Sequence, residues 1–223
     1  LPPVPIDDRT HLVDLDCSGG PLALLGVVVL PDGSSSWKAY RFGLGGWKEE
    51  TDAKFLPPFP ASTNPAAIRE VRLDGPASKC SGLIVSTAEG AGFRGAFLPS
   101  ADGWKNVSSK VPPFDLVSAD GTPSQAVVLD LKGDGFDGIL ASTKTPGGAV
   151  FFVYSQDDQS WHDESQQFKL ASFIASSDPK QPVTSFVGPI VGQGGSDIAI
   201  LNDQRVAAAD VAGTNRQFGK FFT

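Results

Sequence analysis

Two histidines, His11 and His162, are the side chains in this 223-residue chain best suited to acid–base or metal chemistry. A nucleophilic triad needs a Ser or Cys, a base and an orienting group brought together. Neither histidine has a metal-type spacing, and no Gly-x-Ser-x-Gly segment occurs. Acidic pairs that could serve a glycosidase stand in turn-like segments, at Asp7-Asp8, Glu49-Glu50 and Asp157-Asp158. We therefore expect both histidines to be solvated surface residues, and the sequence favours a non-catalytic protein while leaving an enzyme open.

Aromatic side chains form a second set, with a regular spacing. Trp47, Trp104 and Trp161 lie 57 residues apart, and one further step reaches Phe218. An indole ring can stack on the face of a sugar, so these tryptophans could form equivalent glycan sites. A residue kept in every repeat is also what packing between repeats requires, and both interpretations stay open at this point.

A third set of side chains, Trp37, Tyr40 and Arg41, lies outside this repeated pattern and occurs only in the first repeat. Residues that are unique to one repeat are better candidates for a dedicated binding patch than residues that occur in every repeat, because the repeated fold does not require them. We therefore expect a ligand-binding patch at these three positions, in addition to the repeated tryptophans.

The 57-residue spacing organises the whole chain. The first three repeats have an aspartate-led segment, of which the fourth keeps only the end, and all four have short β-branched runs and a hairpin signal that contains Gly or Asn. The pattern predicts a strand, a polar loop, two strands joined by a hairpin, a turn with the aromatic residue, and a fourth extended segment. About four short strands in each repeat are typical of a β-propeller blade. We expect a single all-β domain over 1–223, with repeats at about 11–67, 68–124, 125–181 and 182–223, the last completed by 1–10.

The two ends of the chain predict how the propeller closes. The fourth repeat stops at Phe221-Phe222-Thr223, before its expected closing segment. The chain opens with Leu1-Pro2-Pro3-Val4-Pro5, which matches Leu56-Pro57-Pro58-Phe59-Pro60. We therefore expect a four-bladed β-propeller in which the N-terminal strand closes the last blade and removes exposed sheet edges. The alternative is a four-blade part of a larger propeller.

The aspartate-led segment of the third repeat carries a family resemblance. The run from Asp130 through Asp134 and Asp137 resembles the FG-GAP or VCBS repeat of integrin-α-type propellers, whose Asp-rich loop often binds calcium. The resemblance implies calcium as a cofactor, held by these three carboxylates. Lys132 and Gly138 depart from the family pattern at two ligand positions. The alternative is therefore an Asp-rich turn whose carboxylates accept hydrogen bonds from backbone N–H groups.

The first repeat keeps only Asp16 and Ser18 of this loop pattern, and Cys17 lies between them. Cys80 stands in the corresponding loop of the second repeat. Adjacent blades place equivalent loops side by side, so we expect a Cys17–Cys80 disulfide, the alternative being two free thiols. These cysteines, the Asn106-Val107-Ser108 glycosylation sequon and the lack of Met favour a processed, secreted protein.

Composition narrows the class of partner. The chain has 18 Lys and Arg against 25 Asp and Glu, a formal net charge of −7, which argues against a nucleic-acid surface. No apolar run is long enough for a membrane span. We expect a secreted, non-catalytic binding protein that recognises a glycan or glycoprotein, because some propellers of the resembled family are lectins. The alternatives are a protein-interaction scaffold cut from a larger toxin or adhesion protein, and a small-ligand or metal carrier in a central channel. A homo-oligomer stays open.

Overall fold

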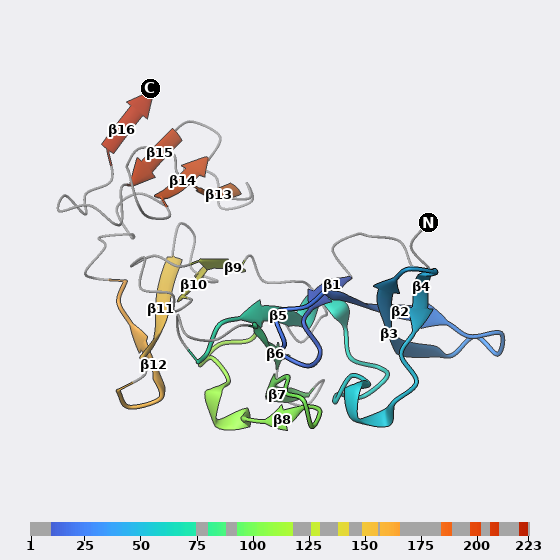
Figure 1. Ribbon diagram of the computed structural model, residues 1–223. Coiled ribbons are helices and arrows are strands. Elements are labelled where there is room, and N and C mark those ends of the chain that lie inside the picture. Colours follow the sequence, from blue (N-terminus) through green and yellow to red (C-terminus); the bar gives the residue numbers. More distant parts are fainter. Residues whose placement is uncertain are drawn as a thin grey trace. The chain divides into compact units, whose positions relative to one another are not determined.

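The computed structural model describes residues 10–74, 80–87, 93–117, 126–129, 138–142, 149–155, 157–165, 184–188, 197–201, 206–209 and 219–222. Within these residues the regular structure is β-strand, apart from three single-turn 3-10 helices. The strands form four antiparallel four-stranded sheets, each in simple chain order (Figure 1). The predicted all-β class is therefore confirmed.

The chain divides into two compact units, each described here by itself. The first unit comprises Leu1–Arg72 and Ser78–Pro123, and the second comprises Leu73–Ala77 and Ser124–Thr223. The first sheet of unit one consists of β1 (His11–Val13), β2 (Ala23–Val29), β3 (Ser35–Gly43) and β4 (Gly46–Glu49). Its second sheet consists of β5 (Ile68–Val71), β6 (Gly82–Ser86), β7 (Arg94–Leu98) and β8 (Lys105–Asn106).

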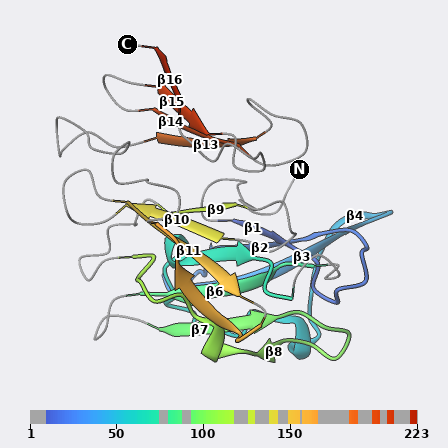
Figure 2. The ribbon, with the colours of Figure 1, turned by 90° about the vertical axis from the view of Figure 1, so that its left-hand side faces the viewer.

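The second unit also holds two sheets. The third sheet consists of β9 (Ala126–Leu129), β10 (Gly138–Ser142), β11 (Ala149–Ser155) and β12 (Ser160–Asp163). The fourth consists of β13 (Thr184–Gly188), β14 (Asp197–Leu201), β15 (Val206–Ala209) and β16 (Gly219–Phe222). Figure 2 shows the four strands of this last sheet side by side. Each sheet falls within one of the stretches expected from the 57-residue spacing.

The two sheets of unit one pack face to face around a shared core. Alternation along β2 sends Leu25 into this core, while Leu24 packs with Tyr40 on the opposite face of the first sheet. The core joins strand residues of both sheets with residues of the segments that flank the strands: Val13, Leu15, Ala23, Leu25, Trp37, Ala39, Phe59, Ala67, Ile68, Leu83, Val85, Phe97 and Val117. β2 is covered on both faces. This explains why its sequence is a continuous apolar run rather than an alternation of apolar and polar residues.

The segment between the two sheets carries short 3-10 helices, η1 (Ala53–Phe55) and η2 (Pro65–Ala67), and η3 (Ser108–Lys110) follows β8. Asp52 caps η1 by accepting a hydrogen bond from the backbone N–H of Lys54, and Asn64 caps η2 in the same way through Ala66. No helix in the described part of the chain has the length and apolar character needed to cross a membrane.

The position of the fourth strand differs from the prediction. Trp47 lies in β4 and Trp161 in β12, so the aromatic segment is itself the outermost strand rather than a turn before it. The Pro57-Pro58-Phe59 segment, expected as the fourth strand, forms none. Proline lacks the N–H that a sheet ladder requires, and Phe59 is instead buried in the core.

This shift also changes the expected closure. The last sheet reaches four strands with β16 alone, so the premise that the C-terminal repeat lacks its closing strand was wrong. The strand expected at residues 1–5 lies outside the described residues.

Candidate functional site

Two residues of the expected first-repeat patch, Trp37 and Tyr40, lie in the protein interior. Trp37 is 6% exposed, and its indole N–H donates to the carbonyl oxygen of Thr63 at 3.3 Å. Its ring meets Phe59 edge to face, with 5.0 Å between ring centroids. Tyr40 is buried on the other face of β3 with Leu24. The structure therefore uses both side chains for packing between and within the sheets.

Arg41, the third residue of that patch, is held between two carboxylates. Its Nε donates to Glu50 at 2.8 Å, and a terminal guanidinium nitrogen donates to Asp16 at 3.1 Å. The guanidinium carbon lies 5.0 Å from the centroid of the Phe55 ring. Arg41 thus ties the loop after β1 and the segment after β4 to the first sheet.

Two of the repeated tryptophans, on the edge strands β4 and β12, each pair with an aromatic ring on the neighbouring strand. Trp47 faces Phe42 across the β3–β4 ladder, and the rings meet edge to face at 5.2 Å. Trp161 faces Tyr154 across the β11–β12 ladder, again edge to face, at 5.5 Å. Both indoles are half-buried, so part of each remains accessible to solvent.

The middle tryptophan, Trp104, has a different environment. It precedes β8, packs against the shared core of unit one, and its indole N–H donates to the carbonyl oxygen of Phe55 at 3.3 Å. Trp104 therefore holds η1 against the second sheet. This is a packing role, one of the two interpretations that the sequence allowed for the repeated tryptophans.

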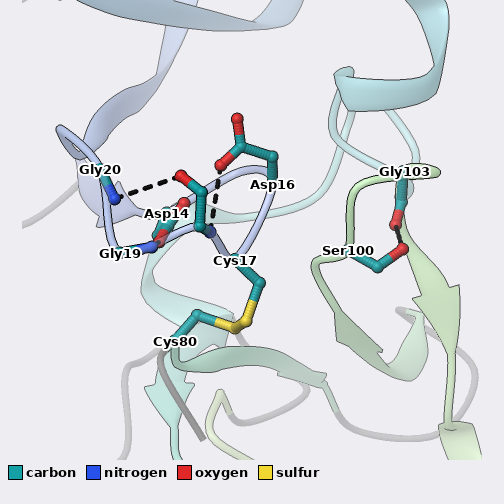
Figure 3. Close-up of a disulfide and its surroundings, with 9 residues drawn as sticks. Asp14, Asp16, Cys17, Gly19, Gly20, Cys80, Ser100 and Gly103 are labelled. Atoms are coloured by element: carbon teal, nitrogen blue, oxygen red, sulfur yellow. Dashed lines mark hydrogen bonds between the residues drawn. A yellow bond between two sulfur atoms is a disulfide. The ribbon is translucent and has the colours of Figure 1, made fainter.

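The predicted disulfide is confirmed. Cys17 and Cys80 are bonded, with 5.2 Å between their Cα atoms and a sequence separation of 63 positions. The bond joins the loop after β1 to the residues before β6, and therefore joins the two sheets of unit one (Figure 3).

The loop that carries Cys17 is a network of side chain to backbone hydrogen bonds. Asp14 accepts from the N–H of Gly19 at 2.7 Å, and Asp16 accepts from the N–H of Ser18 at 3.2 Å. Cys17 and Gly19 have positive φ values of 55° and 74°, which bend the chain sharply here. In the first repeat the Asp-rich segment thus satisfies backbone N–H groups.

The structure also corrects the alignment of this loop. In sequence, Asp14 directly follows β1 and Asp130 directly follows β9, so the strand bounds align Asp14, and not Asp16, with Asp130. The spacing of Asp14, Asp16, Ser18 and Gly19 in the sequence is the signal that could have found this register. Asp130, Asp134 and Asp137, the expected calcium ligands, lie outside the described residues. Across the described ranges, no group of three or more His, Cys, Asp or Glu side chains is placed to hold a metal ion.

The charge of Asp16 is strongly stabilised. Hydrogen bonding from Ser18 is the largest cause that lowers its pKa to about 2, and Asp14 and Arg41 act in the same direction against the effect of partial burial. An ionised Asp16 is the natural partner of the Arg41 guanidinium, so Arg41 on β3 supplies the counter-charge of this loop.

The two histidines differ from each other in environment. His11, expected at the surface, is buried, and its Nδ1 lies 3.0 Å from a carboxylate oxygen of Glu70. The surface expectation was wrong for His11 because β1 alternates and turns His11 and Val13 inward. His162 is exposed, as expected, and its Nε2 contacts Asp158 at 2.7 Å and Ser160 at 3.0 Å.

The group formed by Asp158, Ser160 and His162 has the residue types of a catalytic triad. Both contacts use the same ring nitrogen of His162, whereas a triad needs one nitrogen for the nucleophile and the other for the orienting carboxylate. The group is a polar turn on an exposed hairpin.

No family model matches this chain, and no curated protein matches it.

Proposed function

We propose that this chain is a secreted, non-catalytic binding protein whose four sheets are the blades of one β-propeller. The regular spacing, the identical strand order in each sheet and the shared core of the first two sheets support this arrangement. The disulfide is typical of proteins in an oxidising, extracellular compartment.

A closed ring of four has a size that solution scattering can test. A compact chain of this length has an expected radius of gyration of about 17 Å. A clearly larger radius of gyration, or concentration-dependent association of the free chain, would favour the alternative that the chain is a four-blade part of a larger propeller. Sedimentation at the same concentrations would also settle whether the protein forms a homo-oligomer.

The favoured ligand class is a glycan, and the carrying observation is that two half-buried tryptophans each pair edge to face with an aromatic ring on the neighbouring strand. Trp47 with Phe42, and Trp161 with Tyr154, present the same edge-to-face geometry on the outermost strands of two sheets. A partly exposed indole fixed by a second ring is a rigid surface on which a sugar ring can stack at small entropic cost. Two such surfaces on one chain would raise a weak single-site affinity through avidity.

A glycan array tests this proposal, with and without added calcium. We expect binding that falls when Trp47 or Trp161 is replaced by Ala. The matched control is Trp104→Phe, which removes an indole that is already occupied by packing and a hydrogen bond. An array on which the folded wild-type protein binds no glycan in either condition overturns the proposal.

A protein-interaction scaffold is the second candidate, favoured by one hairpin. The β3–β4 turn is rich in glycine and carries Leu44 fully exposed, next to Phe42 at 56% exposure. The corresponding turn of the third sheet is polar, with exposed Asp157 and Asp158, so the fold itself does not require apolar residues here. Binding of a protein partner that Leu44→Ser abolishes, with no glycan bound, would favour this candidate.

Calcium binding at Asp130, Asp134 and Asp137 is a further proposal, which rests on the family resemblance of that loop. Titration with calcium, followed by calorimetry, tests it on the wild-type chain and on Asp134→Asn. Equal heats for the two proteins would overturn it.

A further inference from the structure

Asn106 is the acceptor position of the sequon Asn106-Val107-Ser108, whose middle residue is not proline. The chain has four asparagines, and none of the other three is followed by Ser or Thr two positions later. A glycan attached to asparagine is bulky and lies on the protein surface. The place of Asn106 in the fold therefore decides whether this motif is a usable modification site.

The structure places Asn106 at an exposed edge of the second sheet. It is the last residue of β8, which pairs with β7 alone among the described strands. Asn106 and Ser108 are both exposed. Val107 between them is half-buried, and its N–H donates to the carbonyl oxygen of Ala96 at 2.7 Å, which anchors the motif to β7. Because no described strand lies beyond β8, a glycan on Asn106 would extend into solvent without displacing a strand of unit one.

A tight turn fixes the side-chain amide of Asn106. Its oxygen, Oδ1, accepts hydrogen bonds from the backbone N–H of Ser108 at 3.0 Å and from the Ser108 hydroxyl at 2.5 Å. A backbone N–H can only donate, so the atom that it meets is the oxygen, and the amide nitrogen, Nδ2, is at the other end of the group. Nδ2 makes no hydrogen bond within the described residues, so it is the open atom of an exposed side chain.

The Ser108 hydroxyl gives this turn a chemical advantage. When Nδ2 bonds to a sugar it must lose a proton, and negative charge then develops on Oδ1 through the amide resonance. Two donors on Oδ1 stabilise that charge and favour the loss of the proton. Asn64 is also exposed and makes the same kind of turn, accepting from the N–H of Ala66 at 3.0 Å. It is followed by Pro65 and lacks a hydroxyl two positions on, so it is an internal comparison for the role of Ser108.

We propose that Asn106 carries an N-linked glycan. The donor is an oligosaccharide joined through its anomeric carbon to a lipid pyrophosphate, and the secretory compartment supplies both this donor and its transferase. Nδ2 forms a bond to the anomeric carbon, and the bond from that carbon to the pyrophosphate oxygen breaks. The lipid pyrophosphate leaves with the bonding electrons, and the proton of Nδ2 passes to a base of the transferase. This inference rests on the proposed secretion and adds a modification site to the surfaces proposed to bind glycans.

The test uses the full chain, expressed with a secretory leader in eukaryotic cells. Intact mass shows whether a glycan is attached. An amidase that removes N-glycans, used in heavy-oxygen water, converts the modified asparagine into a labelled aspartate, which peptide mass spectrometry locates. Asn106→Gln removes the acceptor, and Ser108→Ala removes the hydroxyl while it keeps the acceptor. The matched controls are Ser109→Ala, at the neighbouring exposed serine, and Asn64→Gln, at the comparison turn.

We expect a glycan on the wild-type chain and on both controls, and loss of the glycan in Asn106→Gln and Ser108→Ala. Ser108→Thr should carry the glycan on at least as large a fraction of molecules as the wild type, because a β-branched side chain holds its hydroxyl in fewer rotamers. Thermal melting of each secreted variant verifies that it is folded.

Two results would overturn the assignment. Wild-type protein that is secreted and folded but carries no glycan at Asn106 would remove the site, and would leave the proposed secretion and glycan binding standing. A glycan that persists on Ser108→Ala would remove the role given to the hydroxyl. By contrast, a wild-type chain that carries the glycan but is retained in the cell would support the site and count against the proposed secretion.

Discussion

Nδ1 of His11 lies 3.0 Å from Oε1 of Glu70, although the two residues are 59 positions apart in sequence. His11 is in β1 and Glu70 is in β5, so the contact joins the first strands of the two sheets that share the core of unit one. The histidine ring also lies 6.1 Å from the Trp37 ring, deep against that core. The pair is therefore a polar link placed at an otherwise apolar junction.

Loss of Glu70 should destabilise this junction. In Glu70→Ala the buried His11 Nδ1 loses its partner, and leaving a buried polar group unsatisfied costs about 1–3 kcal/mol. We expect the free energy of unfolding, measured with urea, to fall by that amount. Glu49→Ala is the control, because its pair with Lys38 is more exposed and such pairs contribute about 0–1 kcal/mol. Equal effects of the two substitutions would show that the His11–Glu70 contact is not a buried link.

Much of the fold follows from the 57-residue spacing, because one aromatic residue and one aspartate-led loop mark each sheet. The spacing could not locate the fourth strand, since Trp47 and Trp161 were assigned to turns and the proline-rich segment to a strand. The donor-less prolines of that segment are the physical reason why it stays outside the ladder. A check of N–H donors along each candidate strand would have corrected this.

The candidate site was predictable only in part. The disulfide followed from equivalent loops in adjacent repeats, and Cys17 and Cys80 are bonded. Burial of Trp37 and Tyr40 could not be inferred from their presence in one repeat, because a residue can be unique to a repeat and still pack in the core. The burial of Asp14 could not be inferred either, because the fold of the loop after β1 decides which carboxylate turns inward and accepts from Gly19.

The disulfide should contribute strongly to the stability of unit one. It closes a long loop between residues 63 apart in sequence, and such bonds contribute about 2–4 kcal/mol by constraining the unfolded chain. We expect Cys17→Ser combined with Cys80→Ser to lower the free energy of unfolding by that amount. The wild-type protein treated with a dithiol reductant should behave like the double variant. If reduced and oxidised proteins unfold at the same denaturant concentration, the bond does not stabilise the fold.

Acid should weaken the loop around Asp16. Its pKa in the folded protein is about 2, below the ordinary value of 3.8, so its contribution to stability is complete above pH 4 and is lost as the pH falls towards 2. We expect the difference in unfolding free energy between wild type and Asp16→Asn to shrink over that window. Measurements with urea at several pH values between 2 and 6 give this difference. A difference that stays constant across the window would mean that Asp16 titrates normally in the folded state.

Gly103 is required by a close backbone approach as well as by its conformation. Its φ is +104°, and a Cβ at this position would lie 2.5 Å from the carbonyl oxygen of Lys54 in η1. Gly33 also has a positive φ, of +82°, but a Cβ there would meet nothing within 4 Å. The two glycines therefore separate the cost of the backbone conformation from the cost of a steric clash.

We expect Gly33→Ala to cost about 1–2 kcal/mol, because a side chain at positive φ strains the backbone. Gly103→Ala should cost about 1–3 kcal/mol more, since the added methyl group must push η1 away from the β7–β8 hairpin. The same displacement should weaken the hydrogen bond from the Trp104 indole to Phe55, so the tryptophan fluorescence of Gly103→Ala should shift while that of Gly33→Ala should not. If the two variants lose the same stability and share the wild-type emission, η1 does not pack against Gly103 in solution.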